Sequence, residues 1–298
     1  MWPRIMGFLR LMRPANLPTA GADILAGAAI AGAVSTQYAF TLNTALSDIV
    51  ILFFASVALY AGGVILNDFF DADLDSIERP ERAIPSGLVG KQEALIFGLF
   101  WLLLGVFLAF LVNQNAAIIA AGLAFFIVLY DALAKKNAFT GALTMGVCRG
   151  LNLLLGISIL GTLSAWHLAV IPVLYIFAIT LISQGEVHGG NKRHLMYAGI
   201  IYVSVILIVL YVVNAQESLN GTTIGTLALF ALVILIPWYK AYRTADPRLI
   251  KKAVVAGVLS IILLDVIFAA SFGHISYAFF VLLLLPISIG LGSLFKVT

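Results

Sequence analysis

Residues 47–75 read SDIVILFFASVALYAGGVILNDFFDADLD, an apolar stretch that runs directly into a cluster of aspartates. The part from 47 to 67 is long and apolar enough to cross a membrane as a helix. Carboxylates at the boundary of a bilayer are costly, so an acidic cluster in that place indicates a functional site. The cluster contains Asp68, Asp71, Asp73 and Asp75.

The spacing within this cluster predicts which side chains act together. Asn67, Asp71 and Asp75 are four residues apart, and on a helix each such step turns the side chain by only about 40°. All three therefore project from one face, with Asp68 at its edge and Asp73 off it. Like charges at this spacing repel each other by about 0.2–0.5 kcal/mol per pair. A divalent cation is the natural candidate to hold them together.

The composition places the chain among polytopic membrane proteins. Of its 298 residues, 62% are hydrophobic and 10% are charged, and the mean hydropathy is +1.08. Soluble globular proteins do not have this composition. The single cysteine, Cys148, excludes an intrachain disulfide and a cysteine metal cluster. The net charge of +3 does not indicate a nucleic-acid partner, because membrane topology explains the basic residues.

The predicted fold is all-α, a polytopic membrane helical bundle of about nine to ten transmembrane helices around a central cavity. A single domain is expected over residues 1–298. The first candidate span is rich in alanine and glycine and contains Asp23. The candidate spans are 19–36, 47–67, 92–112, 115–134, 140–161, 166–184, 195–214, 221–240, 252–271 and 275–295.

One orientation accounts for every basic residue. With the N-terminus in the cytoplasm, all 17 lysines and arginines fall on the cytoplasmic side or in a helix near it. The outer connections then carry only Glu217 as a charge. We therefore expect an integral protein of a bacterial inner membrane, with both termini and the functional loops in the cytoplasm.

The segment that follows the first aspartates suits a diphosphate. Residues 67–87 read NDFFDADLDSIERPERAIPSG. Mg²⁺ prefers a few carboxylates together with phosphate oxygens and water, and the guanidiniums of Arg79 and Arg82 can take the remaining phosphate oxygens. Pro80 and Pro85 should end the helix and stiffen the loop. The alternative interpretation is a solvated acidic loop between two spans.

These residues resemble the first aspartate-rich motif, NDxxDxxxD, of the UbiA superfamily of intramembrane prenyltransferases, including its RP-R-IPSG continuation. The strings ERPERAIPSG and CRGLNLLLG also resemble its EboC-like members, beside the 4-hydroxybenzoate polyprenyltransferase-like ones. The resemblance implies that Asn67, Asp71 and Asp75 bind Mg²⁺ and the diphosphate of a prenyl donor. Asp68, Arg79 and Arg82 are then expected to contribute to substrate binding.

The loop near residue 130 resembles the tyrosine–lysine motif of that family. Tyr130 and Lys135 are the matching residues, although they are five positions apart where the family commonly has four, and Lys136 could substitute. Arg149 lies about nine residues into its predicted span, ~14 Å along the helix axis, and should face the bundle interior. We expect Arg149 to contact the diphosphate and Asn152 to line the same wall. The alternative is a structural pair between Arg149 and Asp265 or another buried acid.

The second acidic motif of the family, DxxxD, is incomplete here. Residues 183–192 read SQGEVHGGNK, and only Glu186 is acidic. The resemblance implies a catalytic and metal-binding role for Glu186 and substrate binding by Asn191 and Lys192. His188 is a weaker candidate metal ligand. A second metal would be held less tightly, or Asp68 or Asp73 would be recruited. Asn16 corresponds to a position where the family often has a pocket residue.

The predicted function is Mg²⁺-dependent transfer of a prenyl group from a prenyl diphosphate to an aromatic or other lipophilic acceptor within the membrane. Asp71, Asp75, Arg149 and Glu186 are the predicted catalytic residues. The alternative is a UbiA-like protein that binds or transports a prenylated or aromatic precursor with little or no catalysis. The DGxxAR…GxxxDxxxD pattern of CDP-alcohol phosphotransferases, a third class, is absent.

Overall fold

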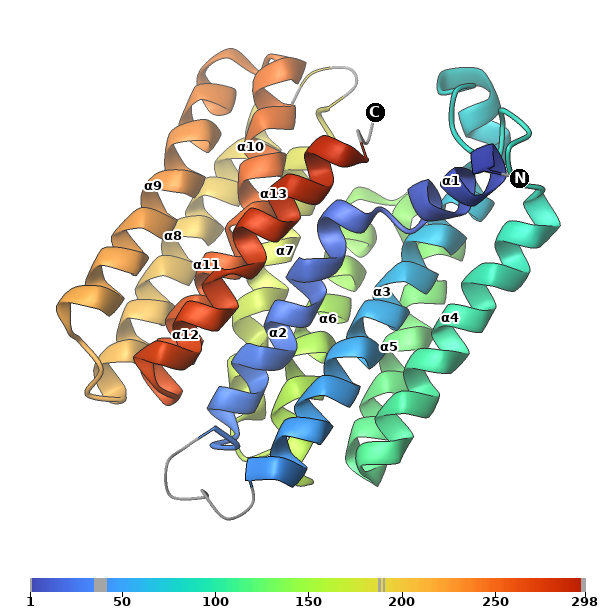
Figure 1. Cartoon of the computed structure of the whole chain (residues 1–298). Helices are drawn as coiled ribbons and strands as arrows, with labels where there is room; N and C mark the ends of the chain where they lie inside the picture. Colours follow the sequence, from blue (N-terminus) through green and yellow to red (C-terminus); the bar gives the residue numbers. More distant parts are fainter. Residues whose placement is uncertain (1, 35–41, 187–188, 190, 296–298) are drawn as a thin grey trace.

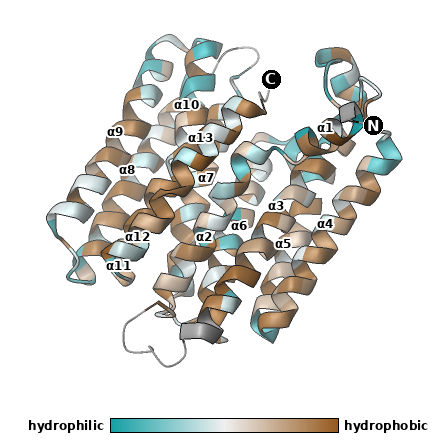
Figure 2. Ribbon diagram, in the orientation of Figure 1, coloured by the Kyte–Doolittle hydropathy of each residue, from teal (hydrophilic) through white to brown (hydrophobic). Residues whose placement is uncertain are grey.

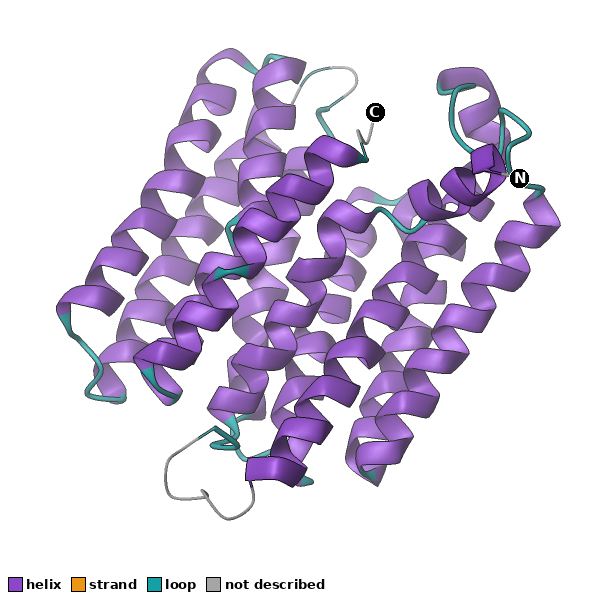
Figure 3. Ribbon diagram, in the orientation of Figure 1, coloured by secondary structure: helices purple, strands orange, loops and turns teal. Residues whose placement is uncertain are grey.

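The computed structural model describes residues 2–34, 42–186, 189 and 191–295, and in them the chain forms an all-helical bundle (Figures 1 and 3). The α-helices are α1 (Trp2–Leu11), α2 (Leu17–Ile30), α3 (Leu42–Glu78), α4 (Lys91–Val112), α5 (Gln114–Ala132), α6 (Ala138–Ile157), α7 (Val170–Ser183), α8 (Lys192–Ala215), α9 (Gly221–Thr244), α10 (Pro247–Leu259), α11 (Ile261–Phe272), α12 (Ile275–Leu282) and α13 (Leu284–Leu294). Short 3₁₀ turns include η1 (Pro14–Asn16) and η3 (Ala134–Lys136).

The described residues contain nine helical segments long and apolar enough to cross a membrane. They correspond to nine of the ten predicted spans, with α10 and α11 together forming one span and α12 and α13 another. Large apolar side chains point outward from them, among them Leu103 at 70% exposure and Phe110 at 64%. In Figure 2 the ribbon along the helix shafts is mostly in the colour of hydrophobic residues. This is the pattern of an integral membrane protein, whose outer face contacts lipid.

The remaining predicted span, 19–36, is shorter in the structure. It forms α2, whose 14 residues extend for only about 21 Å. Twelve of them are buried, from Pro18 to Ile30 except Leu25. Helix α2 is therefore a core helix, enclosed by α3, α6, α11 and α13.

Small residues allow α2 to lie very close to α6. A Cβ added at Gly27 would be 2.6 Å from the backbone carbon of Gly156, and one added at Gly156 would be 2.8 Å from Cα of Ile24. Glycine at both positions lets the two backbones approach as in other membrane helix pairs. This contact brings the polar residues of α2 next to those of α6.

Two groups of helices enclose the centre of the bundle, α3–α5 on one side and α7–α13 on the other, with α2 and α6 between them (Figure 1). Buried apolar side chains form one large cluster in α6–α11 and another in α2–α6. The ends of α3 and α5 lie at the same end of the bundle as both chain termini. We call this end, at Glu78 and Ala132, the motif end.

Candidate active site

The aspartate cluster lies on regular helix. Helix α3 continues from its apolar part through the aspartates and ends at Glu78. No proline or glycine interrupts residues 64–78. Arg79 precedes Pro80, and the residue before a proline is disfavoured in helical conformation. The chain therefore leaves the helix where the sequence predicts.

The helix separates the aspartates as the spacing predicts. Asp68 and Asp75 are buried, at 8% and 4% exposure. The Asp73 side chain is 89% exposed and forms an ion pair of 2.8 Å with Lys91 at the surface. The prediction that Asp73 lies off the shared face is confirmed.

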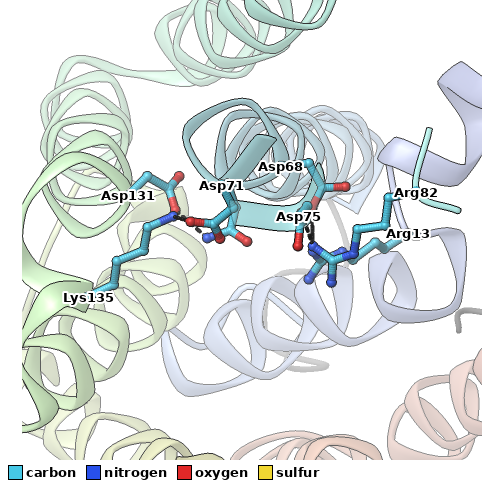
Figure 4. Close-up of polar contacts among 8 residues, drawn as sticks. Arg13, Asp68, Asp71, Asp75, Arg82, Asp131 and Lys135 are labelled. Carbon is cyan, nitrogen blue, oxygen red and sulfur yellow. Dashed lines mark hydrogen bonds and ion pairs between the residues drawn. The ribbon is translucent and has the colours of Figure 1, made fainter. Parts of the chain in front are cut away.

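Arg82 returns over the end of α3 to the carboxylates. Its Nη1 lies 2.6 Å from Oδ2 of Asp75 and 3.4 Å from Oδ1 of Asp68 (Figure 4). The resemblance of the motif predicts that Arg82 binds the diphosphate of a substrate. In the structure its partners are two carboxylates of the motif.

Arg13 is a site residue to which the sequence analysis gave no role. Its Nη2 donates to Oδ1 of Asp68 over 2.6 Å, and the backbone at Arg13 is left-handed, with φ 48°. Such a conformation in a non-glycine residue is strained and occurs preferentially at functional sites. Burial lowers the pKa of Arg13, but Asp68, Tyr60 and Asp131 together outweigh it and the net shift is upward. No motif around Arg13 predicts this, because the contact depends on the turn between α1 and η1.

A second polar group lies at the other edge of this α3 face, toward α5. Lys135 Nζ is 2.7 Å from Oδ1 of Asp71, and Nδ2 of Asn67 donates to Oδ1 of Asp131 over 2.8 Å. Figure 4 shows Asp131 and Lys135 beside Asp71, with the two arginines on the opposite side. Asp131 is 3% exposed and is also absent from the predicted set. The signal was available, because it is an acid within the predicted span 115–134.

The two polar groups on the α3 face together form a layer that we call the polar layer. A cavity of about 360 Å³ lies next to it, between helices of both groups. It confirms the predicted central cavity. Most of its wall is apolar, from α3, α5, α6, α7 and α10. Its polar lining consists of Arg13, Thr19, Ser56, Tyr60, Asn67, Tyr130, Asp131, Arg149, Asn152, Thr180 and Ser183. The cavity thus joins Asn67, Tyr130, Arg149 and Asn152 from the predicted set.

Arg149 faces the bundle interior, as predicted for an arginine at that depth. Its Nε lies 2.7 Å from Oδ2 of Asp23, and both residues are buried, at 8% and 1% exposure. Asn152 donates to the same Asp23 oxygen over 2.7 Å. The buried acid that pairs with Arg149 is therefore Asp23 of α2. A contact between Arg149 and diphosphate stays a prediction.

Glu186 follows the end of α7 and is half-buried. Burial raises the pKa of Glu186, while the positive charges of Lys251 and Arg79 act in the opposite direction. Arg79 is the first residue after α3, and its N–H donates to the carbonyl of Asp75. The positive charge of Arg79, which directly follows α3, therefore acts on the carboxylate of Glu186. Within the described ranges, no three His, Cys, Asp or Glu side chains are arranged to hold one metal ion.

The other predicted residues of this region have local roles. Asn191 is exposed and caps α8, where its side chain accepts from the N–H of Arg193 over 2.9 Å. Lys192 is exposed at the first position of that helix. Asn16 ends η1, and its carbonyl accepts from Thr19 Oγ1. His188 lies outside the described residues. Substrate binding by Asn16, Asn191 and Lys192 stays a prediction.

Comparison with known proteins identifies a family. The model of the UbiA prenyltransferase family matches residues 24–254. A digeranylgeranylglyceryl phosphate synthase of Methanothrix thermoacetophila is 33% identical over 151 residues, which are 51% of this chain and 54% of that protein. The chain thus spans about half the length of that relative. The synthase of the same name from Ignicoccus hospitalis is 27% identical over 92% of this chain and 97% of its own.

Solved structures share the fold. A UbiA homologue from Archaeoglobus fulgidus, bound to GPP and Mg²⁺, has a TM-score of 0.65 and 16% identity, covering 92% of this chain and 99% of that one. A structure of a digeranylgeranylglyceryl phosphate synthase has the same TM-score and 23% identity, covering 92% and 99%. The named relatives are archaeal, so they give no support to the expected bacterial membrane. The family match over residues 24–254 shows that this chain belongs to the UbiA prenyltransferase family.

Proposed function

We propose that this protein is a Mg²⁺-dependent prenyltransferase that moves a prenyl group from a prenyl diphosphate to a lipophilic acceptor within the membrane. The observation that carries the proposal is the polar layer over the apolar cavity. Asp68, Asp71 and Asp75 face that layer from α3, and every one of them has a cationic partner. Asp71 and Asp75 are the proposed metal-binding carboxylates, together with the amide oxygen of Asn67.

The ion pairs suit an exchange of partners. Arg13, Arg82 and Lys135 neutralise the carboxylates in the structure. With Mg²⁺ held by Asp71 and Asp75, Arg82 and Lys135 would be free to bind the non-bridging oxygens of a diphosphate, while Arg13 would stay paired with Asp68. Neither the acids nor the bases are then left unpaired in a site of low dielectric. The donor set of hard oxygens fits Mg²⁺.

The proposed chemistry is the loss of diphosphate from the donor and capture of the allylic cation by the acceptor. Bound Mg²⁺ supplies Lewis-acid stabilisation of the leaving diphosphate. Arg82 and Lys135 would stabilise the same charge as it develops. The apolar wall of the cavity holds the prenyl chain and excludes water from the cation. The acceptor attacks the prenyl carbon that carried the diphosphate and then releases a proton.

Two acceptor classes are consistent with the proposal. An aromatic acceptor follows from the resemblance of the motifs to aromatic prenyltransferases. The relatives are named for digeranylgeranylglyceryl phosphate synthesis, which favours a prenylated glycerol phosphate as the alternative. Both share a nucleophile that can enter an apolar cavity.

The experiment uses the purified protein in lipid with labelled prenyl diphosphates, Mg²⁺ and both acceptor classes. We expect a prenylated product that disappears with EDTA and in Asp71→Asn and Asp75→Asn. Asp73→Asn is the matched control, because that carboxylate lies at the surface, and should retain turnover. Absence of product with every donor and acceptor would contradict the proposal, as would full activity in Asp71→Asn and Asp75→Asn.

A second candidate function is binding or transport of a prenylated precursor without turnover. The incomplete second motif favours it, since Glu186 is the only acid in residues 183–192. The same assay separates the two functions. Retention of intact labelled diphosphate by the protein, with no product released, would indicate binding alone.

We further propose that the motif end faces the cytoplasm. Basic residues gather there at Arg79, Arg82, Lys135, Lys136, Lys192 and Arg193, on segments that the alternating helices bring to one end. Basic residues in short loops favour the cytoplasmic side.

A further inference from the structure

Asp131 has no assigned part in the proposed chemistry, although it is a buried carboxylate in the cavity wall. It lies in the last turn of α5, which ends at Ala132. Its Oδ1 accepts from Nδ2 of Asn67 over 2.8 Å. Asn67 is the first residue of the predicted metal-binding face, so this hydrogen bond acts directly on a candidate ligand.

An asparagine can bind a metal through only one end of its amide. The Oδ1 atom is an acceptor and can coordinate Mg²⁺, whereas the NH₂ group carries two donors that a cation repels. The two ends have nearly the same shape, so packing alone selects weakly between them. A carboxylate accepts hydrogen bonds and does not donate them when ionised. In the structure Asp131 accepts from Nδ2 of Asn67, so Nδ2 faces α5 and Oδ1 is left for the site.

The two segments contact each other at matched intervals. Asn67 and Asp71 are four residues apart on α3, and their partners Asp131 and Lys135 are four residues apart on α5 and η3. Figure 4 shows Asp131 and Lys135 facing the same side of α3. Asp131, which is adjacent to Tyr130, and Lys135 thus both contact the motif on α3. Residues 131–135 therefore hold the side chains of both Asn67 and Asp71.

We propose that Asp131 is a positioning residue, which holds the Asn67 amide with its oxygen toward the cation and thereby raises the affinity of the site for Mg²⁺. This inference rests on the proposed function, because it assumes that the α3 face binds a metal. Groups that orient a metal ligand from behind typically change metal affinity by about 10–100-fold when removed.

The test measures binding of Mn²⁺, used in place of Mg²⁺, to the purified protein with a prenyl diphosphate present. Loss of the electron paramagnetic resonance signal of free Mn²⁺ reports binding without requiring turnover. Asp131→Leu removes the acceptor, and we expect affinity to fall by about tenfold or more. Asp131→Asn keeps an acceptor in the same place and should lose less. Asp73→Asn serves as the control for loss of one negative charge.

An exchange of the two side chains gives the sharper test. Asn67→Asp alone places two carboxylates against each other and should weaken Mn²⁺ binding. In the double variant Asn67→Asp with Asp131→Asn, the new amide donates to the new carboxylate, whose second oxygen faces the site. We expect the double variant to bind Mn²⁺ with an affinity within about threefold of that of the wild type. A double-mutant cycle of these four proteins measures the coupling between residues 67 and 131.

Two results would overturn the inference. One is wild-type affinity in Asp131→Leu, and the other is a double variant that binds Mn²⁺ more weakly than either single variant while its unfolding temperature stays normal. Failure of the proposed function has a different signature. In that case the wild type itself binds no Mn²⁺ with the diphosphate and forms no product.

Discussion

The Arg82 guanidinium lies 2.6 Å from Oδ2 of Asp75, and the two side chains are only 19% and 5% exposed. The pair closes the last turn of α3 against the loop that follows. Because Arg82 also approaches Asp68, one cation compensates two carboxylates of the motif. Removal of the Arg82 side chain should therefore change both the stability of the protein and the effect of Mg²⁺ on that stability.

Arg82→Ala should lower the free energy of unfolding by about 1–3 kcal/mol in EDTA, because it leaves a buried carboxylate without its partner. Mg²⁺ should recover part of this loss, since the metal replaces the missing positive charge. Thermal unfolding in lipid or detergent, with and without Mg²⁺, measures both effects. Lys91→Ala breaks the exposed pair with Asp73 and is the control, with an expected change below about 1 kcal/mol. Equal losses in the two variants would contradict this account.

Arg149 and Asp23 form the most deeply buried ion pair among the described residues. Arg149→Met should destabilise the protein by about 3–5 kcal/mol, because it strands the Asp23 charge. The double variant Arg149→Met with Asp23→Asn should regain most of that stability. A folded double variant that still lacks turnover would support the predicted contact between Arg149 and diphosphate. Full activity in it would leave Arg149 with a structural role only.

Glu186 should make stability depend on pH. Burial raises its pKa in the folded state above the ordinary value of 4.5, so the folded state binds this proton more tightly than the unfolded one. The folded state is therefore stabilised as pH falls through the interval between the ordinary pKa and the raised folded-state pKa of Glu186. This stabilisation is lost as pH rises through the same interval. In EDTA, Glu186→Gln should be more stable relative to wild type at pH 7 than at pH 4. Thermal unfolding across this range checks it, with Glu78→Gln as the control for an exposed carboxylate.

The close contact of α2 and α6 predicts opposite effects of alanine at two helical glycines. Gly27→Ala places a methyl group 2.6 Å from the Gly156 backbone and should cost about 1–3 kcal/mol. Gly225→Ala meets nothing within 4 Å on exposed α9 and should be neutral or stabilising by up to about 1 kcal/mol. Unfolding temperatures of the two variants decide it. A Gly27→Ala protein as stable as wild type would refute the proposed approach of the two backbones.

The orientation of the bundle can be tested by labelling introduced cysteines in intact cells. Ser76→Cys lies at the motif end and Gln216→Cys beyond α8 at the other end, and both positions are exposed. A reagent that cannot cross the membrane should label Gln216→Cys and spare Ser76→Cys. The native Cys148 is buried and provides a low background. The reverse labelling pattern would show that the motif end faces outward.

The sequence by itself determined the class of the protein and one face of its site. Apolar stretches of about 20 residues permit few structures in a bilayer, so nine spans could be predicted from composition and length. The face of Asn67, Asp71 and Asp75 followed from the period of the α-helix, which depends on local geometry alone. The exposed position of Asp73 followed for the same reason.

Only the tertiary structure decided the partners of that face. Arg13 is 55 residues from Asp68 in the chain, and Asp131 is 64 residues from Asn67. Asp23 and Arg149 meet because glycines let α2 and α6 approach closely. Such contacts depend on how helices pack, and helical periodicity carries no information about distant neighbours. The burial of α2 was also decided by packing, since α3, α6, α11 and α13 enclose it.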